Sequence, residues 1–310
     1  EFPDFLHNPS SLVLASGKTT FISKCAPCHR PDAGGLVGPN LTDDYWIHGP
    51  KFADNVKTIW NGVKEKGMLA FRQAVAKWYA DRYQVTVDPA TEVLALIGSK
   101  EGCHHFVLAR VNPGETVLMT DPGYPAYRAS ILMAGGEPVN VPIRAENGYL
   151  PKFSEIPSDV ARRATAMFLN YPNNPTGATA TPAFLSELVE FARQYDIAIC
   201  YDNPYIEVVF DGEKPLSFLS VAGAKDVGVE LNSLSKPFNM TGWRLGMAVG
   251  NRDIIAAISQ VKENTDSGVF NAIQFAGITA LARCGENIGH MLGIYAPRRQ
   301  LVLQTLAEVG

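Results

Sequence analysis

The stretch Val227-Gly228-Val229-Glu230-Leu231-Asn232-Ser233-Leu234-Ser235-Lys236 runs a short apolar strand directly into a loop that carries two serine hydroxyls and a lysine. Similar strands are expected at Val93–Ile97, Thr116–Met119, Ala166–Leu169, Ile197–Tyr201 and Gly246–Val249, with helices at Pro125–Ala134, Thr181–Tyr195 and Arg252–Asn264. Because strands alternate with helices, the pattern predicts an α/β fold in which a mainly parallel sheet carries helices on both faces.

The first 68 residues differ in texture from the rest of the chain. They are rich in turn formers, such as Asp32-Ala33-Gly34-Gly35 and Val37-Gly38-Pro39-Asn40, and contain only short helical patterns. From Leu69 onward a helical spacing begins, carried by Phe71, Val75, Trp78, Tyr79 and Arg82. The sequence therefore predicts two domains, residues 1–68 and residues 69–310.

Composition and charge argue against nucleic acid and membrane as binding partners of the protein. The 310 residues are 46% hydrophobic and 19% charged, and the net charge is −4. This balance predicts a globular protein without the basic field that draws proteins to nucleic acid. No apolar run is long enough to span a membrane. Three isolated cysteines, Cys103, Cys200 and Cys284, are expected to be buried thiols rather than a disulfide framework.

The pentapeptide Cys25-Ala26-Pro27-Cys28-His29 is typical of covalent haem attachment. Cys25 and Cys28 can each add to one vinyl group, which places His29 beneath the iron as an axial ligand. Met68 supplies a thioether suited to the opposite axial position. A zinc site is the alternative, but His7 and His48 do not complete a paired ligand spacing.

A second cofactor is indicated around Lys236, whose amine can form an imine with an aldehyde such as that of pyridoxal phosphate. The groups suited to a phosphate are hydroxyls, basic side chains and a glycine turn between a strand and a helix. In this sequence they are Ser99, Lys100, Ser233, Ser235 and Arg244, with Gly98 to Gly102 as the turn.

The remaining candidates would contact the cofactor ring. Asp202 ends a predicted strand and suits the pyridine nitrogen, although a buried strand-end aspartate that caps a turn is a plausible alternative for this residue taken alone. Asn174 and Tyr205 could hydrogen-bond the phenolic oxygen, and Tyr124 offers a flat face to the ring. The triplet Cys103-His104-His105 admits a metal site, but a partly buried helix turn is favoured.

Residues 67–310, through Ser233 to Gly246 and Asn170 to Gly177, resemble class I/II aminotransferases of fold type I, in the branch with LL-diaminopimelate aminotransferases. The resemblance implies the large domain of a pyridoxal phosphate-dependent transferase that acts on an amino acid and a 2-oxo acid, as a cytoplasmic homodimer. It implies Lys236, Asp202 and Tyr205 as catalytic residues and the other candidates as cofactor ligands.

Residues 10–68 resemble a monohaem cytochrome c domain of the cbb-type oxidase kind, through the haem motif, Gly17 to Phe21, Gly38 to Asp44 and Gly62 to Met68. This resemblance implies a small all-α domain with haem c, an electron-transfer role, a redox partner and a periplasmic or membrane-associated setting. The closing helix of that family is not found after Met68.

The aminotransferase pattern also lacks an N-terminal arm and a small C-terminal domain, so slow transamination is expected. Three hypotheses follow from the two resemblances. The chain is an aminotransferase joined to a haem segment; it is a cytochrome electron carrier beside an incompetent aminotransferase fragment; or it is a chimera whose two parts meet near Lys66 to Phe71. We favour the chimeric origin, because a natural fusion is expected to link two complete domains.

Overall fold

The computed structural model of the protein describes residues 18–26, 31, 68–266 and 268–309. The chain divides into two compact units, Glu1–Lys64 and Glu65–Gly310. The described residues of the first unit contain the π-helix η2, Phe21–Cys25. Cys28 and His29 lie outside the described residues, as does most of the small all-α domain predicted over residues 1–68.

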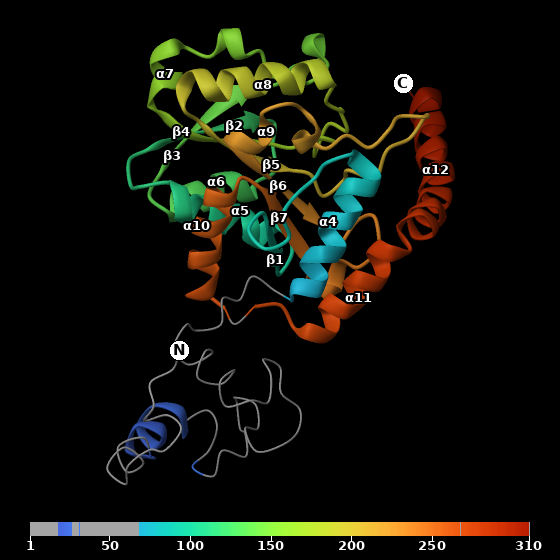
Figure 1. Ribbon diagram of the computed structural model, residues 1–310. Helices are drawn as coiled ribbons and strands as arrows, with labels where there is room; N and C mark the ends of the chain where they lie inside the picture. The colour runs from blue at the N-terminus through green and yellow to red at the C-terminus, as the bar shows by residue number, and fades with distance from the viewer. Residues whose placement is uncertain (1–17, 27–30, 32–67, 267, 310) are drawn as a thin grey trace. The chain divides into compact units, whose positions relative to one another are not determined.

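The second unit is built on one mixed sheet, which among the described residues has seven strands (Figure 1). They are β1 Val93–Leu96, β2 Thr116–Asp121, β3 Glu137–Pro142, β4 Ala164–Leu169, β5 Ala198–Asp202, β6 Gly228–Ser233 and β7 Gly246–Gly250. Their order in space is β1-β7-β6-β5-β4-β2-β3. The strands from β6 to β3 pair in parallel, whereas β7 runs antiparallel to both of its neighbours, β1 and β6.

Helices cover both faces of this sheet (Figure 1). They are α4 Leu69–Tyr83, α5 Ser99–Arg110, α6 Ala126–Met133, α7 Ser158–Arg163, α8 Pro182–Tyr195, α9 Ala224–Val227, α10 Arg252–Glu263, α11 Asn271–Ala282 and α12 Cys284–Val309. The short 3-10 helices are η3 Ala145–Asn147, η4 Phe153–Glu155, η5 Phe218–Ser220 and η6 Thr241–Trp243. α5, α6 and α10 share one hydrophobic core with one face, and α4, α8, α9 and α11 share a second core with the other.

The predicted α/β architecture is confirmed as a mixed sheet between helices, and all six predicted strands occur with slightly shifted ends. The edge strand β3 was not predicted, because Pro138 and Pro142 interrupt its strand pattern and proline is tolerated mainly at sheet edges. The reversed direction of β7 was not predicted either, since an apolar strand of five residues carries no signal for its orientation.

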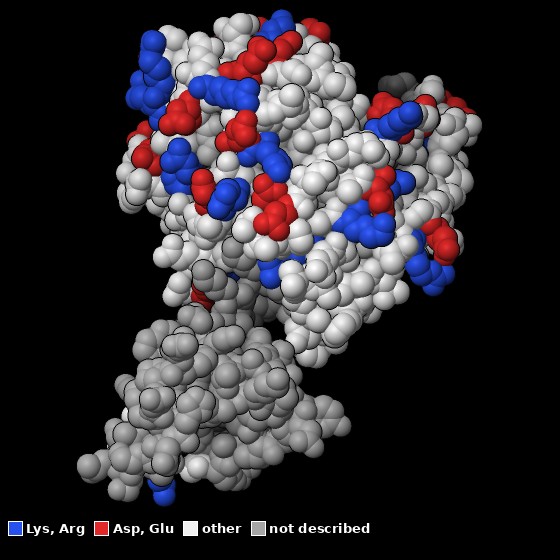
Figure 2. Space-filling model, viewed as in Figure 1, with Lys and Arg blue, Asp and Glu red and all other residues white. Residues whose placement is uncertain are grey.

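The three isolated cysteines are buried free thiols, as expected from the sequence. Cys284 accepts a hydrogen bond from Trp78 Nε1 over 3.1 Å, which joins the start of α12 to α4. No helix among the described residues is long and apolar enough to cross a membrane. On the face shown in Figure 2, basic and acidic side chains of the second unit are intermixed, so this face carries no extended field of one sign.

A buried carboxyl group ties α4 to the centre of the sheet. Glu230 lies on β6 with none of its surface exposed. It accepts hydrogen bonds from the Tyr79 hydroxyl over 2.8 Å, the Ser217 hydroxyl over 3.0 Å and the Phe218 N–H over 2.7 Å. Burial raises the pKa of Glu230 to about 7, against these hydrogen bonds, which lower it. The protonated form of Glu230 is therefore favoured by folding.

Because the folded pKa of Glu230 exceeds its unfolded value, its contribution to stability is full in acid and is lost as the pH rises through about 7. We expect the free energy of unfolding of the wild type to fall, relative to Glu230→Gln, on the order of 2–3 kcal/mol between pH 5 and 8. Urea unfolding at both pH values measures this difference. Glu187→Gln, at an exposed position on α8, is the control. An equal change in the free energy of unfolding of wild type and Glu230→Gln between the two pH values would contradict the prediction.

Candidate active site

A cavity of about 260 Å³ opens where the carboxyl ends of β1, β4, β5 and β6 meet at one edge of the sheet. All ten residues predicted from the sequence to bind pyridoxal phosphate line it: Ser99, Lys100, Tyr124, Asn174, Asp202, Tyr205, Ser233, Ser235, Lys236 and Arg244. Their positions along the chain are far apart, so the sheet topology is what brings them together.

Three lining residues were not predicted from the sequence: Asn170, Pro204 and Thr241. Asn170 directly follows β4, so the same strand-end position that singled out Asp202 could have identified it. The Thr241 hydroxyl donates to the Ser235 carbonyl over 3.0 Å. This bond holds the lysine loop closed, and nothing in the sequence pattern indicates it.

One end of the cavity is shaped for an anion. The β1–α5 turn passes through Gly98 at a φ of +81°, and Ser99 begins α5, whose first N–H groups have no intrahelical partner. Arg244 packs across this turn, with Nη1 bonded to the Thr241 carbonyl over 3.0 Å and to Ser235 Oγ over 3.4 Å. A guanidinium and a helix N-terminus at one place favour a phosphate group.

Two glycines make this close approach feasible. A Cβ on Gly98 would lie 2.1 Å from Arg244 Nη2. A Cβ on Gly246, in β7, would lie 2.7 Å from the Asn232 carbonyl and 2.9 Å from the Ser99 nitrogen. Any side chain at either position would push the arginine, or the start of α5, away from the anion end of the cavity.

Asp202 forms the buried inner wall of the cavity. Its side chain is only 3% exposed, and Oδ2 accepts a hydrogen bond from the Tyr127 hydroxyl over 2.8 Å. Oδ1 has no hydrogen-bond partner among the described residues. Burial raises the pKa of Asp202 to about 6, while the neighbouring Tyr127 hydroxyl and Cys103 thiol act to lower it. An N–H cation placed against Oδ1 would satisfy this carboxylate.

Asn170 connects Asp202 to the loop that follows β4. Its Nδ2 donates to the Asp202 carbonyl over 2.6 Å, and its Oδ1 accepts from the Asn174 N–H over 2.7 Å. Tyr205 faces the same space, and burial raises the pKa of its hydroxyl, which Asn174 counteracts. The Tyr124 ring packs edge-on against Tyr127 with their centroids 5.6 Å apart. These contacts give the cavity rigid polar walls.

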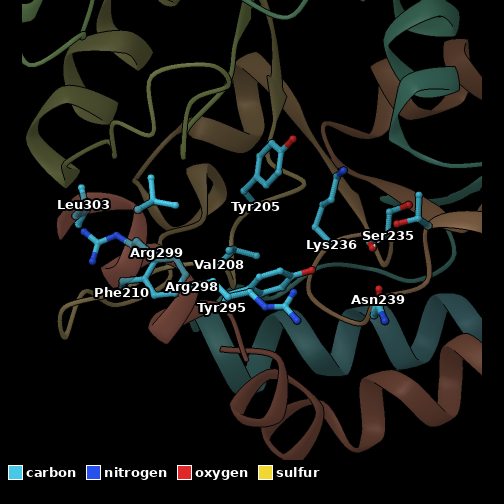
Figure 3. A pocket seen from close by; sticks show the side chains of 12 residues that line it. Tyr205, Val208, Phe210, Ser235, Lys236, Asn239, Tyr295, Arg298, Arg299 and Leu303 are labelled. Carbon is cyan, nitrogen blue, oxygen red and sulfur yellow. Dashed lines mark hydrogen bonds between the residues drawn. The ribbon is translucent and has the colours of Figure 1, made fainter. Parts of the chain in front are cut away.

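Lys236 stands at the mouth of the cavity. Its side chain is exposed, with Nζ 5.8 Å from the centre of the Tyr205 ring. Within the described part of the chain, Nζ makes no hydrogen bond or ion pair. Lys236 and Tyr205 extend in the same direction from neighbouring loops (Figure 3). The amine is thus available to react with a carbonyl carbon.

A second, larger cavity of about 580 Å³ adjoins the first and shares with it Tyr205, Ser235, Lys236 and Thr241. Its outer wall is α12. Arg299 is engaged there with Asp211, at 2.8 Å, and lies over the Phe210 ring. The guanidinium of Arg298 lies beside the Tyr295 ring (Figure 3) and has no ion pair with any described residue.

The haem candidates are only partly described. The backbone of Cys25 ends η2, and Cys28 and His29 lie outside the described residues. Met68 is half-buried against the core of the second unit, and its N–H donates to Gln274 Oε1 over 2.8 Å. Its assignment as an axial ligand stays a prediction.

The triplet Cys103-His104-His105 lies within α5, with Cys103 and His105 buried. The groups that approach one another as potential metal ligands are instead Glu101, His105 and Asp266. No metal role is therefore assigned to the triplet.

Comparison with known proteins matches each part of the chain to a family. The family model described as aminotransferase class I and II matches residues 57–310. The model described as cytochrome C oxidase, cbb3-type, subunit III matches residues 13–79.

Relatives of the longer segment include the LL-diaminopimelate aminotransferase of Moorella thermoacetica, 52% identical over 79% of this chain. The enzyme of the same name from Syntrophobacter fumaroxidans is 50% identical over 89% of the chain. The chain spans 63% of the length of the first relative and 71% of the second.

Solved structures also resemble the second unit. Apo-BacF from Bacillus subtilis superposes with a TM-score of 0.73 at 38% identity, over 79% of this chain and 66% of that one. An aromatic aminotransferase from Pyrococcus horikoshii gives a TM-score of 0.75 at 30% identity, over 79% of this chain and 66% of that one.

Gly98 and Gly114 provide a matched test of the anion site, because both have positive φ values, +81° and +83°, but only a Cβ on Gly98 meets Arg244. We expect Gly98→Ala to weaken the binding of pyridoxal phosphate by about tenfold or more, since the displaced guanidinium loses charged hydrogen bonds. Gly114→Ala should bind like the wild type. Equal losses in the two variants, measured by absorbance titration, would attribute the effect to backbone strain alone.

Proposed function

Because this chain belongs to the class I and II aminotransferase family, we propose that residues 69–310 bind pyridoxal phosphate and transfer an amino group between an amino acid and a 2-oxo acid. The observation that carries the proposal is that one cavity holds both the buried Asp202 Oδ1, which has no partner among the described residues, and the exposed amine of Lys236. A pyridinium N–H would satisfy the first, and an aldehyde carbon would engage the second.

Each end of the cavity has a distinct task in this proposal. Arg244, Ser99, Lys100, Ser233 and Ser235 would hold the phosphate, helped by the N-terminus of α5. When bound, the cofactor supplies an aldehyde that takes up the substrate amine and a ring that withdraws electrons from the substrate carbon.

The residues around the proposed ring position would control the protonation and charge of the cofactor ring. The Asp202 carboxylate would keep the pyridine nitrogen protonated, and with a pKa of about 6 it is ionised at neutral pH. The Tyr205 hydroxyl and the Asn174 amide would donate hydrogen bonds to the phenolic oxygen. Tyr124 would cover one face of the ring. Lys236 would then be placed to remove and return the proton on the substrate carbon.

The cavity beside Lys236 supports a substrate with a distal carboxylate. Arg298 is a guanidinium without an ion-pair partner among the described residues, and the walls formed by Val208, Val302 and Leu303 are apolar. A carboxylate carried on a short aliphatic chain suits such a surface. Since two relatives are LL-diaminopimelate aminotransferases, we propose this amino acid as the first substrate to test. The homodimer implied by the family also stays a prediction.

The cofactor proposal is tested by titrating pyridoxal phosphate into wild type and Lys236→Ala. We expect the wild type to develop a visible absorption change that Lys236→Ala lacks, because Lys236 would supply the amine that bonds to the aldehyde, whereas Lys100 would lie at the phosphate end of the cavity. Arg298→Ala is the companion variant. It should keep the absorption change yet raise the KM for LL-diaminopimelate by about tenfold, through loss of a charged hydrogen bond. Identical titrations of wild type and Lys236→Ala would refute the proposal.

We propose as a second function that residues 1–68 bind haem c and transfer electrons to a redox partner. The match of residues 13–79 to a cbb3-type cytochrome family and the motif Cys25 to His29 support it. His29 and Met68 would be the axial ligands, and a thioether opposite an imidazole raises the reduction potential.

Expression with a haem-attachment system tests the second function. The pyridine haemochrome spectrum of the wild type should show haem linked through thioether bonds, and Cys25→Ala/Cys28→Ala should lose that signature because no thiol remains to bond the vinyl groups. A wild-type spectrum without the thioether-linked signature counts against haem attachment.

We also propose that the two parts were joined by recombination, cloning or assembly. The two family matches overlap over residues 57–79, which includes the junction predicted from the sequence. Continuous DNA reads from the source across codons 60 to 80 decide this question, since an intact join in the genome would refute cloning or assembly and leave recombination as the origin.

A further inference from the structure

The turn that carries the anion site is held from inside the protein as well as from the cavity. On the cavity side, Arg244 Nη2 donates to the Ile97 carbonyl over 3.4 Å. On the inner side, the Ile97 N–H donates a short hydrogen bond to Glu101 Oε2. The same peptide segment is therefore fixed by a cation on one side and by a carboxylate on the other, just before Gly98 and Ser99.

Glu101 is in turn fixed by a buried lysine. Lys262 projects from α10 with only 1% of its side chain exposed, and its Nζ donates to Glu101 Oε1 over 2.6 Å. Nζ also contacts both oxygens of Asp266 at 2.9 Å. One ammonium thus lies between two carboxylates, out of contact with solvent. Such a cation is stable only where its partners remove the cost of desolvation.

The contacts of Lys262 occupy the carboxylates that could otherwise hold a metal ion. Glu101, His105 and Asp266 could in principle hold a metal ion, yet Lys262 Nζ already bonds to both carboxylates. His105 Nδ1 lies 3.3 Å from Glu101 Oε1. Burial and the nearby Lys262 lower the pKa of His105 to about 4, so the imidazole is neutral at pH 7. Lys262 is accordingly the positive charge that balances Glu101.

We propose that Lys262 is a positioning residue for phosphate binding, which acts through Glu101 on the Ile97–Ser99 turn. Lys262 does not line the cofactor cavity. If its charge is removed, Glu101 and Asp266 are left as two neighbouring carboxylates with no cation, and their repulsion displaces Glu101 from the Ile97 N–H. The turn then loses the geometry that places Ser99 and the α5 N-terminus against the anion. The inference rests on the proposed cofactor site.

The test compares pyridoxal phosphate with pyridoxal, which lacks the phosphate, by absorbance titration of the full chain. We expect Lys262→Met to weaken the binding of pyridoxal phosphate by about tenfold or more, while the affinity for pyridoxal changes by less than about twofold. Glu101→Ala, which removes the acceptor for Ile97 but leaves Lys262 paired with Asp266, should produce the same selective loss. Glu101→Ala also tests the proposal if Lys262→Met does not fold.

Two further variants separate positioning from general destabilisation. Glu101→Gln/Lys262→Met should recover most of the phosphate-dependent affinity, because a neutral glutamine still accepts the Ile97 N–H and needs no cation. Lys225→Met, on α9, removes a different part-buried ion pair, which Lys225 forms with Glu92 at 2.8 Å, and should bind both ligands like the wild type.

Each remaining outcome has a defined meaning. Three results would overturn the inference: an equal loss of affinity for both ligands, unchanged affinities in Lys262→Met and Glu101→Ala, or no recovery of pyridoxal phosphate affinity in the double variant. Failure of the wild type to bind either ligand would refute the proposed cofactor site itself, so the two failures are distinguishable.

Discussion

The antiparallel strand β7, inserted between β1 and β6, is the constraint on which the site depends. Because β7 is antiparallel to both neighbours, β1 and β6 run in the same direction, and their carboxyl ends lie on the two sides of Gly246. There is no space for a side chain at Gly246 between the Asn232 carbonyl and the Ser99 nitrogen. This close packing places the start of α5 beside the serines of the lysine loop, and an anion site follows from it.

Polar groups buried beneath the sheet hold the first helix of this unit in place. Tyr79 bonds to Glu230, while Arg82 and Tyr83 bond to Glu207. Removing one partner would leave a carboxyl group buried without compensation, which is among the costliest changes in a protein core. α4 is the helix in which the two family matches overlap, and its contacts are those of the aminotransferase core.

The same principle extends from the core to the site. Lys262 and Glu101 form a buried charged network behind the proposed anion site, and Asp202 forms a half-satisfied one behind the proposed ring site. A charged group that has all its partners makes a rigid support, whereas one with a free oxygen provides a binding position. The fully paired network thus supports the turn, and the unpaired Asp202 oxygen lies where we propose that a ligand binds.

By itself, the sequence determined the α/β class and ten of the thirteen residues that line the cavity at the strand ends. Apolar runs between turn formers mark the strands, and reactive side chains follow them at strand ends, so both are local patterns. The edge strand β3, the direction of β7 and the supporting contacts of Asn170, Tyr127 and Lys262 were decided only by the tertiary structure. The physical reason is that a buried polar group is stable only with a partner, and the partners of Asp202 and Glu101 come from distant segments that only the packed sheet and helices bring within bonding distance.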